Sequence, residues 1–153
     1  MGKMQAHTQY AMGAELVEVR GHVRTREVRG PRIVGAFAAG RIVNPRTAHS
    51  QLMGGMIWGR SSALHEATEV DPRRAACIDN SLAEYLISVN ADIGKVDIIL
   101  VPEVDEGVNP AGIKGQGELG NVCTATAVCN AIYNATGTRI RDLPVRIEKL
   151  LAV

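Results

Sequence analysis

One acidic residue, Glu118, lies in a loop that is dense in glycine. The glycines around it are Gly112, Gly115, Gly117 and Gly120. Glycine lets a backbone pass close to a bulky neighbour because it has no Cβ and tolerates positive φ. The sequence from Asn121 to Thr136 predicts a helix closed by Gly137, and a helix start favours negative charge. Glu118 is therefore either an ordinary acid at a helix start or a general base held on a rigid mount.

Residues 115–120 also fit the dinucleotide-binding pattern G-x-G-x-x-G, but the surroundings of that pattern are missing. The pattern requires a strand that ends at its first glycine, and residues 108–112 intervene here. It also requires a continuing β-α-β unit, and only about sixteen residues follow Gly137. A nicotinamide or flavin site on this loop is therefore disfavoured.

Composition bounds the class of protein. A chain of 153 residues that is 46% hydrophobic and 22% charged is expected to fold as one globular domain. A net charge of +1 and 3% aromatic residues argue against a nucleic-acid partner. No apolar run is long enough to span a membrane, and residues 1–9 lack the apolar core of a secretory signal.

The three cysteines are predicted to be reduced core residues. Cys77, Cys123 and Cys129 are odd in number and lack C-x-x-C spacing, which suits neither a disulfide framework nor structural zinc. Cys123 and Cys129 are expected on different faces of their helix. No metal-ligand spacing relates the four histidines, which are His7, His22, His49 and His65. No metal bound directly by protein side chains is predicted.

Two N-terminal segments predict an antiparallel hairpin. Ala14–Arg20 alternates apolar and charged residues, and Glu27–Phe37 returns as its partner after a turn at residues 21–26. Pro31 cannot donate to a ladder, so the second strand is expected to have an edge or a bulge there. Residues 1–12 are predicted to be a loose N-terminal segment, and residues 13–153 the folded unit.

A helical pattern runs from Pro45 to Glu69, after a turn at Asn44, with Thr47 or Ser50 as the expected N-cap. Its predicted buried face consists of Leu52, Met56, Gly59 and Ala63. Three glycines, Gly54, Gly55 and Gly59, lie inside this helix, and each costs about 1 kcal/mol relative to alanine. They indicate that another backbone or a ligand packs closely against the helix.

The remaining elements predict an α+β fold. Lys95–Glu103 is the clearest strand, and Asp71–Arg74 a turn. Ala75–Ser81 is interpreted as a loop or short strand, and Leu82–Val89, ambiguous by periodicity, as a loop with strand character. A short helical turn is expected near the C-terminus, after Pro144. The order of elements predicts a hairpin and mixed sheet packed against two main helices.

Several ordered motifs together resemble one enzyme family. These are Gly40 to Ala48, Ser50 to Gly59, Gly112 to Gly120 and Asn134 to Pro144. They are similar to the C-terminal end of the molybdenum-binding subunit of the xanthine dehydrogenase/aldehyde oxidase family, nearest its bacterial, aldehyde-oxidising, three-subunit branch. The likeness runs from about Tyr10 to Leu151, and implies that this chain is part of a larger molybdopterin-binding domain.

The resemblance implies a role for particular residues. Glu118 matches the family's essential glutamate, the general base that removes the proton from the hydroxyl whose oxygen attacks the substrate's carbon. Gln51 matches the glutamine that hydrogen-bonds the cofactor near the metal. The cofactor-binding backbone would come from Gly54, Gly55, Lys114, Gly115, Gln116 and Gly117.

The resemblance also implies partners. The cofactor would be molybdopterin with molybdenum, in the cytosine dinucleotide form, and [2Fe–2S] and FAD would lie on partner subunits. The substrate would be a small aldehyde or an N-heterocycle. The family's subunit is several times longer than this chain, and residues 21–26 replace its usual acidic turn. We therefore expect a catalytic portion that is inactive without the upstream region, in the cytoplasm or exported with a partner. The alternative is a non-catalytic remnant that self-associates.

Overall fold

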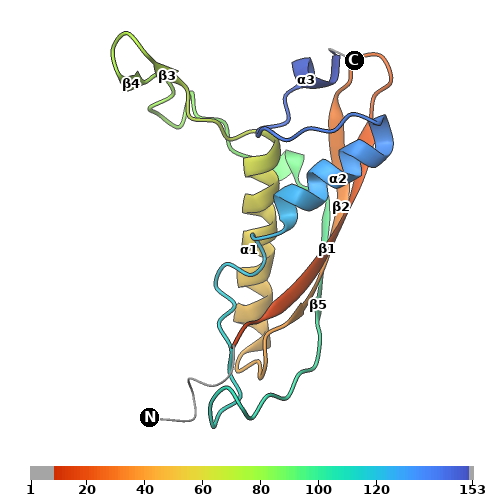
Figure 1. The fold of residues 1–153 in the computed structure, drawn as a ribbon, viewed down its shortest axis with the longest axis vertical. Coiled ribbons are helices and arrows are strands. Elements are labelled where there is room, and N and C mark those ends of the chain that lie inside the picture. Colours follow the sequence, from red (N-terminus) through yellow and green to blue (C-terminus); the bar gives the residue numbers. More distant parts are fainter. Residues whose placement is uncertain (1–8, 152–153) are drawn as a thin grey trace.

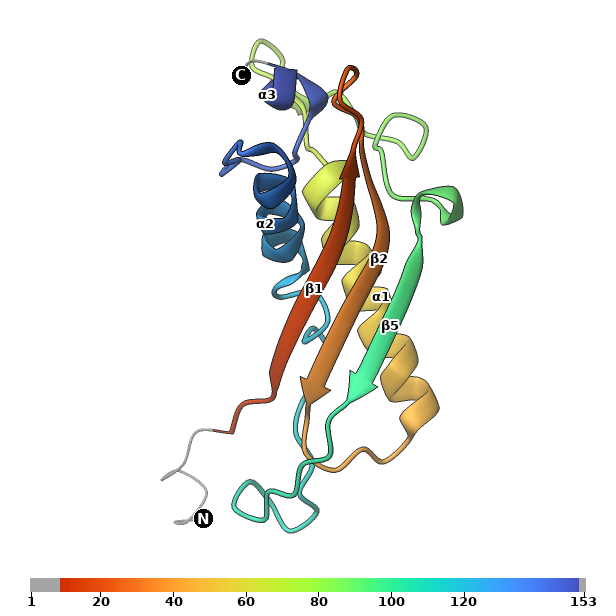
Figure 2. The same cartoon turned by 90° about the vertical axis from the view of Figure 1, so that its right-hand side faces the viewer.

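A three-stranded mixed sheet forms one layer of the protein (Figure 2). The computed structural model describes residues 9–151, so the predictions for residues 1–8 lie outside it. Strands β1 (Met12–Gly21) and β2 (Val28–Ala38) form the antiparallel hairpin, and β5 (Lys95–Leu100) runs parallel to β2, in the order β1-β2-β5. The predicted hairpin and mixed sheet are confirmed.

The predicted irregularity at Pro31 is a bulge in β2. Glu18 pairs with Arg32 and Arg20 pairs with Arg29, so three steps along β2 oppose two along β1. Pairing with β5 begins at Arg32, directly after the proline. The residue that cannot donate therefore lies where β2 needs no ladder hydrogen bond on that side.

Two helices, α1 (Pro45–Leu64) and α2 (Thr124–Thr136), cover one face of the sheet (Figure 2). The fully buried side chains between the sheet and α1 are Ile33, Phe37, Leu52 and Met56. A second cluster joins α1 and α2 to the C-terminal segment, through Ala63, Val128, Ile132, Val145 and Leu150. On the other face, Leu16 and Ile99 are 74% and 53% exposed.

The predicted buried face of α1 is confirmed, but both of its ends differ from prediction. The N-cap is Asn44, whose side chain accepts from the N–H groups of Arg46 and Thr47, rather than Thr47 or Ser50. Pro45 then occupies the first turn, where a missing N–H costs nothing. The helix ends at Leu64 instead of Glu69, and the His65 ring lies 3.0 Å from Ser88 Oγ. That tertiary contact is invisible to helical periodicity.

Helix α2 starts at Thr124, three residues later than predicted, and ends as predicted at Gly137, which has φ 75°. Residues 117–123 form successive turns instead of helix, with the N–H of Asn121 bonded to the Glu118 carbonyl at 2.9 Å. Glu118 is therefore six residues before α2, in a turn, and the prediction that it lies at the helix start is wrong.

The remaining elements are short (Figure 1). Strands β3 (Val70–Asp71) and β4 (Ala76–Cys77) form a small hairpin, η1 (Asn90–Asp92) is a 3-10 turn, and α3 (Ile147–Leu151) is the predicted C-terminal turn. Residues 82–89 contain no strand. Within residues 9–151, no helix combines the length and apolarity that a membrane crossing would need.

The cysteines are free, but they are less buried than predicted. Cys77 is exposed in β4, which corrects its placement in the core. Cys123 and Cys129 are half-buried at the start and middle of α2. Cys77 lies in no segment with an amphipathic pattern, so its burial was predicted only from the usual preference of cysteine for the core.

Candidate cofactor-binding site

The glycine loop lies against α1 through a hydrogen bond from Gln51. Its side-chain Nε2 donates to the carbonyl oxygen of Gly117 at 2.5 Å, across 66 residues of sequence. Gly117 directly precedes Glu118, so the peptide that carries the candidate base is fixed to the helix. In residues 9–151 Gln51 Oε1 accepts no hydrogen bond, and the residue is exposed.

Two of the three helix glycines allow the chain before α2 to approach α1 closely. A Cβ on Gly55 would lie 2.9 Å from the carbonyl carbon of Gly120, and one on Gly120 would lie 2.4 Å from the Leu52 carbonyl oxygen. A Cβ on Gly59 would lie 2.6 Å from the Thr124 side chain. The predicted close approach of another backbone is confirmed at Gly55, whereas Gly59 is covered by the Thr124 side chain. The contact at Gly55 places Glu118 beside α1.

Gly54 behaves differently. A Cβ there would meet nothing within 4 Å, and the same holds for Gly115 and Gly117. Gly54 is three residues after Gln51, so the two share one side of α1. Of the two predicted neighbours, a backbone or a ligand, no backbone of residues 9–151 packs against Gly54. The glycines at these three positions leave open space around the loop.

The loop is held to the end of the sheet by Lys114. Its side chain is 6% exposed, and Nζ lies 2.5 Å from Glu103 Oε1 and 2.9 Å from Asp105 Oδ2. Glu103 Oε2 also accepts the Gly40 N–H at 2.7 Å. The Lys114 side chain is therefore bound to the segment after β5.

These charges shift one another's titration. The hydrogen bond from Lys114 is the main reason that the pKa values of Glu103 and Asp105 are lowered. The hydrogen bonds to Glu103 and then Asp105 raise the pKa of Lys114. Lys114, Glu103 and Asp105 therefore stay ionised near neutral pH, and their ion pairs hold the start of the glycine loop in place.

A turn at residues 109–113 also helps to hold the glycine loop, together with the Lys114 ion pairs. Asn109 Oδ1 accepts the N–H groups of Ala111 and Ile113, and Gly112 adopts φ 66°. The Gly112 carbonyl then accepts the Arg41 N–H at 2.7 Å. A non-glycine residue would be strained at Gly112, so this glycine serves the turn itself.

A second buried cluster lies where β1 meets the start of α2. Thr124 Oγ1 donates to Glu15 Oε2 and lies 2.9 Å from the Gly120 carbonyl oxygen. Burial raises the pKa of Glu15, and burial followed by the Glu15 charge raises the pKa of Cys123 to about 11. Sequence reasoning missed Glu15, Glu103 and Asp105 as neighbours of the loop, and an inward-facing acid in a strand was the available signal for Glu15.

The residues of this site suit a bound cofactor better than a bare metal ion. In residues 9–151 no group of three or more His, Cys, Asp or Glu side chains could hold a metal. The buried Oε1 of Gln116 has no hydrogen-bond partner in the same described part of the chain. With open space at Gly54, Gly115 and Gly117, this orphaned acceptor fits a bulky group with hydrogen-bond donors against the loop.

Comparisons with known proteins show which family the chain belongs to. The sequence profile described as "Molybdopterin cofactor-binding domain" matches residues 1–94. The chain is 42% identical over 145 residues to the aldehyde oxidoreductase molybdenum-binding subunit PaoC of Escherichia coli (strain K12), covering 95% of this chain and 20% of that protein. It is 32% identical to a probable xanthine dehydrogenase subunit of Bacillus subtilis (strain 168), covering 95% and 19%.

The crystal structure of the aldehyde oxidoreductase from Desulfovibrio desulfuricans ATCC 27774 has the same fold. It superposes with a TM-score of 0.83 at 30% identity, over 93% of this chain and 15% of that one. This chain belongs to the molybdopterin cofactor-binding domain family, among the molybdenum hydroxylases related to xanthine dehydrogenase and aldehyde oxidoreductase. It spans about a fifth of the length of these curated relatives.

Proposed function

We propose that this chain forms one wall of the molybdenum cofactor site in a hydroxylase that oxidises an aldehyde or N-heterocycle with oxygen from water. The observation that carries the proposal is the hydrogen bond from Gln51 to Gly117, which fixes the peptide of Glu118 beside α1. The cofactor, when bound, supplies the redox centre that accepts two electrons from the substrate carbon.

Glu118 acts as the general base in this proposal. Conversion of an aldehyde to an acid takes up one water and releases two electrons and two protons, so a group is needed to remove a proton from the attacking oxygen. Glu118 is exposed at the surface of the turn, and its peptide is fixed on both sides. Gln51 holds the preceding carbonyl, and the Asn121 N–H bonds the Glu118 carbonyl.

The cofactor would lie against the open side of the loop. We assign direct contacts to Gly54, Gly115, Gln116 and Gly117, because three of these leave open space and the fourth has an unpartnered acceptor. Gly55 and Lys114 would act indirectly, since Gly55 contacts the Gly120 backbone and Lys114 is bound to two acids. The bacterial likeness supports the cytosine dinucleotide form of the pterin.

The working enzyme would include other polypeptides. A region corresponding to the upstream part of the longer relatives would supply the other cofactor contacts and the substrate pocket. Subunits carrying [2Fe–2S] clusters and FAD would remove the electrons. The exposed Leu16 and Ile99 on the uncovered sheet face support burial against such a partner. We expect assembly in the cytoplasm, with export where a partner carries the signal.

The test is substitution of Glu118→Gln in the reconstituted enzyme. Turnover should be abolished while molybdenum content stays at the wild-type level, because the amide keeps the shape and loses the base. Glu106→Gln, an exposed acid of a nearby turn, is the matched control and should keep full turnover. Turnover retained by Glu118→Gln would contradict the proposal, and absence of molybdenum and partners from the native chain would favour a non-catalytic remnant.

A further inference from the structure

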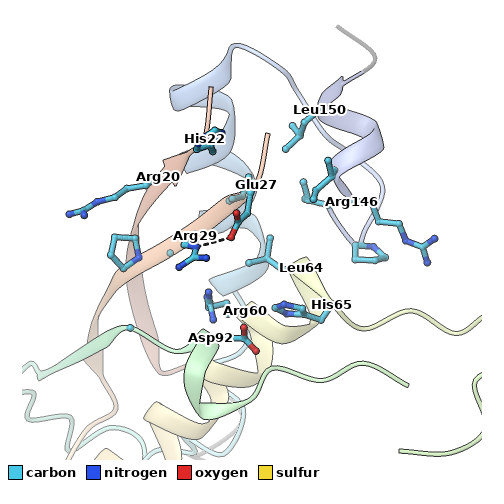
Figure 3. Close-up of a pocket in the computed structure, with 18 of the residues that line it drawn as sticks. Arg20, His22, Glu27, Arg29, Arg60, Leu64, His65, Asp92, Arg146 and Leu150 are labelled. Carbon is cyan, nitrogen blue, oxygen red and sulfur yellow. Dashed lines mark hydrogen bonds and ion pairs between the residues drawn. The ribbon is translucent and has the colours of Figure 1, made fainter. Parts of the chain in front are cut away.

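A cleft of about 1320 Å³ lies where the C-terminal end of α1 meets the β1–β2 hairpin (Figure 3). Its walls come from the turn end of the hairpin, from residues 91–94 and from residues 144–150. Arg60, which lines this cleft, is nine residues after Gln51, or about 13 Å along the helix at 1.5 Å per residue. None of the roles assigned to the glycine loop uses this cleft.

Arg60 is the buried charge of the cleft. It is 4% exposed, and its Nε and Nη1 atoms have no hydrogen-bond partner among residues 9–151. Gly30, in the β2 bulge, makes room for it, since a Cβ there would lie 3.3 Å from Nε. The bulge in β2 therefore accommodates a guanidinium group under the strand.

The other arginines of the cleft already have partners. Arg29 pairs with Glu27 at 2.7 Å, Arg20 with Glu18 at 3.1 Å, and Arg146 with Glu69. All three are exposed on the surface. Arg60 thus differs from them in both burial and pairing.

The acid whose charge acts on Arg60 is Asp92, and its carboxylate is already hydrogen-bonded to another group. Asp92 Oδ2 accepts the Val89 N–H at 2.9 Å, within the 3-10 turn η1. Its negative charge favours the charged form of Arg60, but no ion pair joins the two in the described part of the chain. A buried guanidinium without a bonded counterion costs several kcal/mol, so an anionic partner from outside residues 9–151 would stabilise Arg60.

We propose that the Arg60 cleft is a binding site for an oxyanion, a carboxylate or phosphate group that pairs with the buried guanidinium. The planar N–H groups of arginine match the oxygens of either group. The oxyanion has two candidate sources, a free small anion or an acidic side chain of the polypeptide that precedes this region in the longer relatives.

The experiment follows the side-chain Nε–H signal of Arg60 by NMR in the ¹⁵N-labelled 153-residue chain. The signal is assigned from its own backbone, so no variant is needed to find it. Sodium phosphate and then sodium acetate are added, with sodium chloride of equal ionic strength as the reference. We expect a saturable shift of the Arg60 signal, while the paired Arg29 and Arg146 signals respond no more than they do to chloride.

Matched variants give a second readout. Phosphate should raise the Tm of the wild-type chain and of the control Arg29→Lys, and leave the Tm of Arg60→Met unchanged. In chloride alone Arg60→Met should be more stable than the wild type, because it removes an unpaired buried charge. Arg60→Met less stable in chloride would show that the guanidinium is satisfied within this chain, and would overturn the proposal.

The same NMR measurement also identifies the source of the oxyanion. A response to phosphate or acetate indicates a free small anion. A response only to the added upstream polypeptide, lost when that polypeptide's acids are amidated, indicates a side-chain carboxylate. No response of the Arg60 signal to any of these would overturn the proposal.

Discussion

The side-chain amide of Gln51 bonds the backbone carbonyl of Gly117 at 2.5 Å, joining the second turn of α1 to the residue before Glu118. A loop with open glycines at positions 115 and 117 would otherwise have few contacts to define its path. This bond, the Lys114 ion pairs and the close approach of Gly120 to α1 together hold a glycine-rich segment in one conformation.

The first prediction concerns that bond. Gln51→Ala should lower the free energy of unfolding by about 1 kcal/mol, the net value of a typical intramolecular hydrogen bond. It should also speed amide hydrogen exchange at Gly117 and Glu118, measured by NMR. Ser50→Ala, an exposed neighbour on the same helix, should change neither quantity. Equal exchange in the two variants would show that Gln51 does not order the loop.

The second prediction contrasts adjacent glycines of α1. Gly54→Ala should raise the free energy of unfolding of this chain by about 1 kcal/mol, because alanine favours helix and nothing obstructs the methyl group. Gly55→Ala should lower it by roughly 1–3 kcal/mol, because the methyl group would press on the Gly120 backbone. Urea unfolding measures both.

The same pair separates stability from cofactor binding. In the reconstituted enzyme Gly54→Ala should reduce molybdenum content although the chain itself is more stable. Unchanged molybdenum content would mean that Gly54 does not face the cofactor.

The third prediction is a pH dependence. The pKa values of Glu103 and Asp105 are lowered in the folded protein, chiefly by Lys114, so their stabilising effect is present above their unfolded values of about 4. It is lost as the pH falls through the lowered folded values. The raised pKa of Lys114 adds stability below its unfolded value of about 10.4, which is lost as the pH rises through the folded value.

Substitution of Lys114→Met should therefore destabilise the chain most at neutral pH and flatten both limbs of the stability curve. Urea unfolding midpoints across the pH range provide the measurement. Lys95→Met, which removes an exposed partner of Asp97, is the control and should have a small effect. Parallel curves of stability against pH for the wild type and Lys114→Met would contradict the view that Lys114 causes the pKa shifts of Glu103 and Asp105.

The fourth prediction concerns thiol reactivity. With a pKa of about 11, Cys123 has roughly one thiolate per thousand molecules at pH 8, whereas Cys77 is exposed to reagent. Labelling followed by peptide mass spectrometry should therefore modify Cys77 well before Cys123. Glu15→Gln removes the nearby negative charge and should speed labelling of Cys123. Glu18→Gln, on the outer face of the same strand, should leave that rate unchanged.

Much of the fold was predictable from local pattern. Period-two alternation placed β1 and β2, because successive side chains of a strand point to opposite faces of the sheet. Pro31 marked the bulge and Gly137 the end of α2, because both residues act through their own backbone chemistry. Asn44 was the true cap of α1 although Thr47 and Ser50 offered similar side chains. Several side chains near a helix start have an oxygen that could act as the N-cap. The direction from which the chain enters the helix decides which of these oxygens reaches the free N–H groups of the first turn.

The sequence by itself determined the family of this protein, the buried face of α1 and the position of one acid among glycines. The tertiary structure alone decided what those residues contact. In the tertiary structure Lys114 forms ion pairs with Glu103 and Asp105, and Gln51 donates a hydrogen bond to the Gly117 carbonyl. Helix α2 begins only at Thr124. The tertiary structure also separated Gly55, which a backbone covers, from Gly54, which faces open space. The reason is that glycine has the same sequence signature in both settings, and only the chain packed against it, distant in sequence, distinguishes them.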